Sequence, residues 1–156
     1  MTTGIAAPAM AEARGAGSPN AATDSSLGAG SPGVLADTAP LTRYWWLKKD
    51  HMSSVFHPGE GYAAEFVLGQ IHTTAQPGTH PLFQCTKGSD RFTSPQFNCE
   101  GFPNIGLIGY AYSTPPAAPN RAFYRCLVRS NGEHFDSNDP NCEGQRPEGL
   151  QGYLLL

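Results

Sequence analysis

The chain has 156 residues, of which 15% are charged, and a formal net charge of −3. Its lysines and arginines form no basic stripe, which argues against nucleic-acid binding, because neutralising phosphates requires a clustered positive face. No apolar run approaches the roughly 20 residues of a membrane helix, which argues against membrane insertion.

The first 40 residues predict a disordered arm. All sixteen aromatic residues lie between Tyr44 and Tyr153, and residues 1–40 are rich in Ala, Gly, Ser and Pro. Such a segment cannot offset its chain entropy by burial. Residues 1–11 resemble the small-residue end of a signal peptide, although they could equally continue the arm. The arm also carries spaced apolar side chains, which we expect to contact a protein partner: Leu27, Val34 and Leu35.

Residues 41–156 are expected to form one domain built from three copies of a segment of about 40 residues. Residues 82–110 and 123–153 are the two clearest copies, and Cys99 and Cys142 lie 43 residues apart in them. A fainter copy without cysteine lies over residues 44–69. Self-similarity at a fixed period of this size is typical of a repeat architecture.

Each copy predicts short strands separated by polar turns. Aromatic runs open the copies, and Gly, Pro, Asn and Ser separate the apolar stretches, a pattern that favours strands over helices. Residues 57–66 are the one candidate for a helix or an irregular segment. Three copies of this length can close about a pseudo-threefold axis, which removes exposed sheet edges. The sequence therefore predicts an all-β fold, a β-trefoil, in which the glycines of the Gly-x-Gly-Tyr motif permit unusual dihedral angles or close approach.

The four cysteines favour two disulfides that each close one copy. The chain has no Cys-x-x-C motif and no Cys/His pair at zinc-site spacing. Four cysteines allow three pairings. The repeat favours the pairing within copies, which is Cys85 with Cys99 and Cys126 with Cys142. Structural disulfides imply an oxidising compartment, so we expect a secreted protein.

The third copy resembles a repeat of secreted bacterial proteins that is often appended to hydrolases. The residues that carry the resemblance are Phe123, Tyr124, Arg125, residues 133–135, Glu143, Gly144, Gly149, Gly152 and Tyr153. The second copy departs from this pattern with Arg91 in place of His, and the first with Met52. The resemblance covers about three-quarters of the chain and implies a non-catalytic domain similar to a β-trefoil. A long arm on a small secreted trefoil also resembles the layout of adaptor subunits in multi-protein bacterial toxin particles.

No residue pattern points to catalysis, a metal or a cofactor. His51 and His134 each follow an acid, but neighbours on a strand point to opposite faces, so a structural role in a turn is favoured over general-base work. Residues 136–141 are rich in oxygen ligands, yet they lack the Gly and bidentate Glu that a calcium loop needs. The chain has no nucleophile-elbow, zinc-protease or phosphate-loop motif. We therefore expect a protein that is not an enzyme.

Surface aromatic residues are the remaining candidates for a binding site. Trp45 and Trp46 are adjacent, so one is expected to face the core and the other to face outward, where it could stack on a sugar or anchor a protein. Tyr110 and Tyr112 share one face, and one of them is expected to line a shallow pocket. The favoured function is an adaptor whose arm docks on a larger secreted protein and whose trefoil contacts another. The alternatives are a lectin-like carbohydrate-binding module and a protease-inhibitor trefoil.

Overall fold

The computed structural model describes residues 37–47 and 49–156, which form an all-β domain without an α-helix. Residues 1–36 of the predicted arm, which include the possible signal-peptide remnant and Leu27, Val34 and Leu35, lie outside the described residues. The described strands are β1 (Thr38–Trp46), β2 (Asp50–Ser54), β3 (Tyr62–His72), β4 (Thr79–Lys87), β5 (Asp90–Ser94), β6 (Asn104–Tyr112), β7 (Asn120–Leu127), β8 (His134–Ser137) and β9 (Arg146–Leu155). Single 3-10 turns, η1 (Cys99–Gly101) and η2 (Cys142–Gly144), follow β5 and β8.

The segment 57–66 is not helical. Residues 57–61 are irregular, and β3 begins at Tyr62. Two glycines with positive φ, Gly59 and Gly61, occupy this connection, and a helix interior disfavours glycine. The boundary predicted between the arm and the domain lies at residue 41, but β1 begins at Thr38, so strand structure starts before that residue.

The strands fall into three segments with one pairing pattern, which we call unit 1 (β1–β3), unit 2 (β4–β6) and unit 3 (β7–β9). In each unit the first strand pairs antiparallel with both the second and the third. Each first strand also shifts register against its third strand directly after a fully buried residue, namely Leu41, Leu82 or Phe123. Such bulges bend the strand and increase its twist, which lets one long strand continue from one part of the domain to another.

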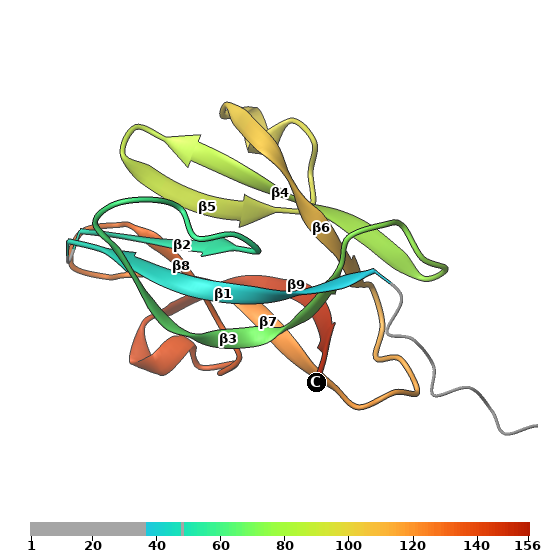
Figure 1. Ribbon diagram of the computed structural model, residues 1–156. Helices are drawn as coiled ribbons and strands as arrows, with labels where there is room; N and C mark the ends of the chain where they lie inside the picture. Colours follow the sequence, from blue (N-terminus) through green and yellow to red (C-terminus); the bar gives the residue numbers. More distant parts are fainter. Residues whose placement is uncertain (1–36, 48) are drawn as a thin grey trace, which may run out of the picture. The chain divides into compact units, whose positions relative to one another are not determined.

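The third strands of the units, β3, β6 and β9, meet one another at their carboxyl ends (Figure 1). Glycines make this approach possible. A Cβ atom on Gly109 would lie 2.6 Å from the carbonyl oxygen of His72, and one on Gly152 would lie 2.8 Å from that of Tyr112. Gly152 also has a φ of +145°, which L side chains rarely adopt. The expectation that these glycines permit close approach is confirmed.

Burial divides the interior into one central cluster and two smaller ones. The central cluster joins all three units and consists of Leu41, Leu68, Ile71, Leu82, Ala111, Phe123 and Leu154. Each smaller cluster surrounds a disulfide, with Phe92 beside Cys85–Cys99 and Phe135 beside Cys126–Cys142. The second strands β2, β5 and β8 contact one another, and β2 and β8 run side by side in Figure 1.

Both disulfides have the expected pairing, Cys85–Cys99 and Cys126–Cys142. In each case the bond fixes a 3-10 turn against the first strand of its own unit. Unit 1 has no cysteine. Tyr44, which corresponds in the repeat to Cys85 and Cys126, is buried there, and its ring packs edge-on against His57 at 5.3 Å between centroids. Two disulfides fit an extracellular protein.

Candidate functional site

An acid followed by a basic residue stands at the start of each second strand, as the first two residues of β2 and β5 and, at β8, as Glu133 just before the strand and His134 as its first residue. These pairs connect different units. His51 Nδ1 lies 2.8 Å from Glu133 Oε1, and His134 Nδ1 lies 2.6 Å from Asp90 Oδ2. At the third junction the backbone N–H of Arg91 donates to Asp50 Oδ1 at 3.1 Å. The acid that meets each base therefore comes from another unit and not from the adjacent residue in sequence, and the three contacts together form a cycle.

Burial sets the protonation of these groups. It raises the pKa of Glu133 to about 7, and the nearby carboxylates of Asp50 and Asp90 contribute to the shift. Burial also lowers the pKa of His51 to about 3, with a contribution from the positive charge of Arg43. The pKa of Asp50 rises to about 6 for the same main reason, loss of water. His51 is therefore a neutral ring at physiological pH and serves as a hydrogen-bond partner.

A buried arginine joins unit 1 to unit 3. Arg43 Nε lies 2.6 Å from Glu65 Oε2, and its two terminal nitrogens lie 2.7 and 3.3 Å from the carboxylate oxygens of Glu143. Arg43 also donates to the carbonyl oxygen of Asp136. His51 Nε2 lies 3.6 Å from Glu65, which continues the row of polar groups to Glu133. We call this row the charged ladder of the junction between units 1 and 3.

The same charged ladder recurs between units 3 and 2. Arg125 Nε binds Glu148 at 2.8 Å, and its terminal nitrogens bind Glu100 at 2.7 and 3.1 Å. His134 Nε2 lies 3.1 Å from Glu148. Glu100 and Glu143 occupy the same place in the two Cys-Glu-Gly turns, where both have positive φ. Each disulfide thus places the carboxylate that an arginine of another unit binds.

The third junction, between units 2 and 1, lacks this ladder. Gln84 stands where the other units have Arg43 and Arg125, and Ile105 stands where they have Glu65 and Glu148. Unit 1 also has no Cys-Glu-Gly turn to supply the second carboxylate. This difference was not predicted, although it is visible in the sequence when the copies are aligned on Gly69, Gly109 and Gly152.

The junction between units 1 and 3 opens into a cleft of about 420 Å³, which we call the Trp45 cleft. Trp45 is half-buried at its edge, and its ring centroid lies 3.9 Å from that of His51. The residues that line the cleft are Arg43, Trp45, His51, Glu65, Val128, Ser130, Asn131, Glu133, Phe135, Glu143 and Gln145. Its volume lies within the range of about 300 to 1,000 Å³ that small-molecule sites occupy.

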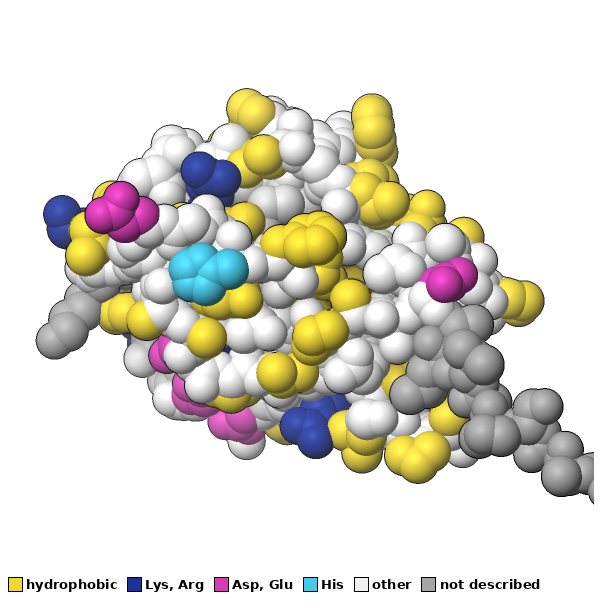
Figure 2. Space-filling model, viewed as in Figure 1, with side chains coloured by type: hydrophobic (Ala, Val, Ile, Leu, Met, Phe, Trp, Pro, Cys, Tyr) yellow, Lys and Arg dark blue, Asp and Glu magenta, His cyan; other side chains and the backbone are white. Residues whose placement is uncertain are grey.

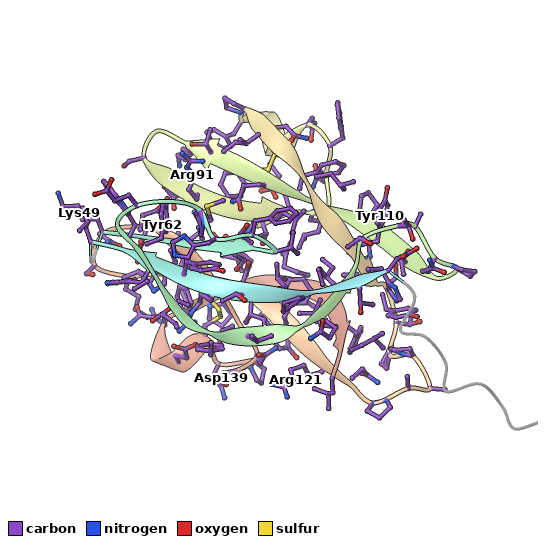
Figure 3. All side chains as sticks on the ribbon, in the orientation of Figure 1. Lys49, Tyr62, Arg91, Tyr110, Arg121 and Asp139 are labelled. Carbon is purple, nitrogen blue, oxygen red and sulfur yellow. A yellow bond between two sulfur atoms is a disulfide. The ribbon has the colours of Figure 1, made fainter. Side chains whose placement is uncertain are left out.

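Trp46 lines a different cleft, of about 310 Å³, on the other side of β1. Its neighbours there include Asp50, Tyr62 and Arg91, and Tyr62 and Arg91 are labelled in Figure 3. Both tryptophans are therefore half-buried, and neither belongs to the core as one was expected to. The reason is that each face of this end of β1 borders a junction with another unit.

The two tyrosines lie apart from the tryptophans. Tyr110 is at the opposite end of the domain from Tyr62 and Arg91 (Figure 3). Tyr112 lies beside His72, with its hydroxyl 3.1 Å from Nε2. Tyr110 pairs with His72 across β3 and β6, and Tyr112 pairs with Tyr153 across β6 and β9. The four aromatic residues therefore do not form one site.

The oxygen-rich segment 136–141 forms internal hydrogen bonds. Asp136 is buried and accepts from the Thr93 hydroxyl at 2.7 Å. Asp139 accepts from the backbone N–H groups of Asn141 and Glu143, each at 2.9 Å. The contacts of Asp139 are turn contacts, which Asp commonly makes, whereas that of Asp136 joins unit 3 to unit 2. Within residues 37–47 and 49–156, no group of three or more His, Cys, Asp or Glu side chains is placed to hold a metal.

Comparison with protein-family models, with curated proteins and with solved structures gave no match. Among the described residues, no helix is long and apolar enough to cross a bilayer. What the protein binds must therefore be inferred from its own residues.

Proposed function

We propose that this protein is a secreted, non-catalytic binding protein of the β-trefoil type, and that the Trp45 cleft binds a saccharide. The common pairing pattern of the three units, the meeting of β3, β6 and β9, and the contacts among β2, β5 and β8 support a closed threefold arrangement. The resemblance to a repeat of secreted bacterial proteins and the two disulfides support secretion.

The repetition of the charged ladder supports a structural role for its acids and histidines. Perturbed carboxylates in a cleft are ordinary candidates for catalysis. Here, however, an acid, a histidine, a glutamate and an arginine occur at equivalent places in two junctions. The pair with strongly shifted pKa values, His51 and Glu133, is buried and hydrogen-bonded to each other. Both ladders join strands of different units, so we assign them the role of stabilising the packing of the units against one another.

The observation that carries the saccharide proposal is the position of Trp45 beside a row of polar groups. A sugar ring has an apolar C–H face, which an aromatic ring covers, and hydroxyl groups that both donate and accept hydrogen bonds. Glu65 and Glu143 supply acceptors, while Ser130, Asn131 and Gln145 supply both donors and acceptors. Among the described residues that line this cleft, Arg43 is the single cation beside several carboxyl groups, so we expect a neutral or amino sugar and not an acidic one.

A glycan array followed by isothermal titration calorimetry tests this proposal. We expect wild-type protein to bind a neutral or amino saccharide, Trp45→Ala to weaken binding at least tenfold, and Trp46→Ala to leave it within about twofold. Thermal melting of each variant separates loss of the site from loss of the fold. An array without hits, or equal binding by the two variants, contradicts the proposal. Mass spectrometry showing that the bound saccharide is cleaved contradicts the non-catalytic assignment.

A protein-binding adaptor, as in the layout of bacterial toxin particles, is the second candidate. Exposed apolar side chains on unit 2 and on the loop after β2 favour it: Ile105 is 48% exposed, Leu107 50% and Phe56 79%. Hydrophobic side chains gather across β6 and the end of β2 in Figure 2. Patches of this kind commonly mark interaction sites. To test whether the arm takes part in partner binding, residues 12–36 can be deleted and the proteins that co-purify with the truncated chain compared with those that co-purify with the full chain.

A further inference from the structure

The cleft of about 310 Å³ beside Trp46 lies where unit 2 meets unit 1, and we call it the Trp46 cleft. Trp46 is the last residue of β1, and the residues directly opposite it are Asp50 on β2 and Tyr62 on β3. Directly opposite residues of antiparallel strands have their side chains close together on one face. The rings of Trp46 and Tyr62 are 6.3 Å apart between centroids and tilted by 37°, so they form one half-buried aromatic wall.

The connection between β2 and β3 packs against the Trp46 indole. A Cβ atom on Gly61 would lie 2.8 Å from Trp46 Nε1, and Gly61 has a φ of +85°. The backbone of this connection therefore lies directly beside the ring and limits its movement. A ring that is already held in place loses little conformational entropy when a ligand stacks on it.

The cation of the Trp46 cleft is Arg91, which stands where units 1 and 3 have a histidine. His51 and His134 each use a ring nitrogen to contact the acid of another unit. Arg91 uses only its backbone N–H, which donates to Asp50 Oδ1. Its side chain therefore takes no part in the cycle of contacts. Within the part of the chain that the structure describes, its guanidinium forms no hydrogen bond or ion pair with another residue.

This guanidinium is the charge that a ligand in the cleft can reach. Arg43 and Arg125 each bind two carboxylates of the protein, whereas Arg91 is half-buried and binds none among the described residues. Asp50 is the one acid in the described lining, but it is only 3% exposed. The planar guanidinium of an arginine matches a carboxylate, to which it donates two parallel hydrogen bonds.

We propose that the Trp46 cleft binds an acidic saccharide, a sugar that carries a carboxylate. Arg91 binds the carboxylate, and the rings of Trp46 and Tyr62 cover the apolar C–H face of the sugar. The hydroxyl groups of Tyr62 and Ser89 both donate and accept, as sugar hydroxyls require. A volume of about 310 Å³ is at the lower end of the range of ligand sites and suits a single sugar ring.

The Trp45 and Trp46 clefts differ in the charge that they offer. In the Trp45 cleft several carboxyl groups surround Arg43, which is bonded to two of them. In the Trp46 cleft the accessible charge is the unbonded guanidinium of Arg91. The inference thus goes beyond the proposed function, because it assigns a second site with the opposite charge preference. It does not depend on saccharide binding in the Trp45 cleft.

Methyl glucuronide is the probe that tests the site, and the indole N–H signals in NMR spectra of the full chain are the readout. We expect the probe to shift the signal of Trp46 and to leave that of Trp45 in place. Methyl glucoside, which has a hydroxymethyl group in place of the carboxylate, should bind about tenfold more weakly or less. Acetate, which has the carboxylate without the ring, should also bind about tenfold more weakly or less.

Each probe can overturn one part of the proposal. Absence of a Trp46 shift at millimolar methyl glucuronide overturns the site. Equal binding of methyl glucoside overturns the role of the carboxylate, and equal binding of acetate overturns the assignment to a sugar. Shifts of Trp46 that persist when neutral saccharides fail to bind anywhere would contradict only the function proposed for the Trp45 cleft.

Two substitutions provide the matched comparison. Arg91→Gln should weaken binding of methyl glucuronide by about tenfold or more. It should keep the wild-type melting temperature, because the guanidinium binds no other described residue. Arg121→Gln removes an exposed arginine on β7, which lies away from Arg91 in Figure 3, and should leave binding unchanged. Equal binding by the two variants overturns the role of Arg91.

Discussion

Glu133 and His51 form a buried pair whose effects on stability oppose each other as pH changes. Between about pH 4.5 and 7 the folded protein keeps a proton on Glu133 that the unfolded chain has released, so lowering the pH through this range stabilises the fold. Below about pH 6.5 the unfolded chain protonates His51 while the folded protein does not, which destabilises the fold. The two effects largely cancel between about pH 4.5 and 6.5.

Glu133→Gln removes one side of this balance. We expect the variant to lose stability relative to wild type as pH falls from about 7 to 4.5, by about 2 kcal/mol, because it lacks the stabilising proton uptake of Glu133, whereas His51 and Asp50 contribute to both proteins. Urea unfolding at several pH values measures the difference. Glu60→Gln, on an exposed loop, controls for the loss of a carboxylate. A difference between Glu133→Gln and wild type that does not change with pH would show that the pair does not titrate in this way.

Gly152 and Gly149 separate the effect of close packing from that of backbone conformation. Both lie in β9 with similar φ, +145° and +152°, but only Gly152 faces a backbone oxygen, that of Tyr112. We expect Gly149→Ala to lower the free energy of unfolding by about 1 kcal/mol, the effect of the backbone conformation alone. Gly152→Ala should lower it by about 3 kcal/mol or more, because β6 and β9 must also move apart. Denaturant unfolding of the two variants tests this, and equal losses would contradict the close approach.

At the scale of elements, each disulfide stabilises its unit and also positions a carboxylate for another unit. Removing Cys126–Cys142 by a double serine substitution should lower the free energy of unfolding by about 3 kcal/mol, the value expected for a closed loop of this size. Removing Cys85–Cys99 in the same way should lower it by a similar amount. Their effects on binding should differ, because Glu143 borders the Trp45 cleft and Glu100 does not. Titration calorimetry should show weaker saccharide binding only in the variant without Cys126–Cys142. Equal weakening in both would mean that the bonds act on the whole domain.

The sequence predicts the elements better than the contacts between units. The strands follow from aromatic runs between turn residues, and the disulfide pairing follows from two cysteines in each of two copies. The bonds of Arg43 to Glu143 span 100 residues and depend on how the units meet, which no local pattern specifies. The half-buried position of both Trp45 and Trp46 was not predicted for the same reason, because alternation along a strand assumes one buried and one exposed face.

At the scale of the whole molecule, the three units meet at two junctions with a charged ladder and one without. Charged ladders join unit 1 to unit 3 and unit 3 to unit 2, while Gln84 and Ile105 leave the corresponding ladder positions between units 2 and 1 without charge. Of the two charged junctions, the one between units 1 and 3 has a tryptophan beside a cleft in the size range of ligand sites.

The most direct test of this account is amide and indole NMR mapping of the full chain with the tightest saccharide found on a glycan array. The account predicts shifts that centre on the Trp45 indole, Glu65, Ser130 and Asn131, with little change at Tyr110 at the other end of the domain. Shifts centred on Tyr110 and Tyr112, or no shifts from any saccharide at millimolar concentration, would contradict it.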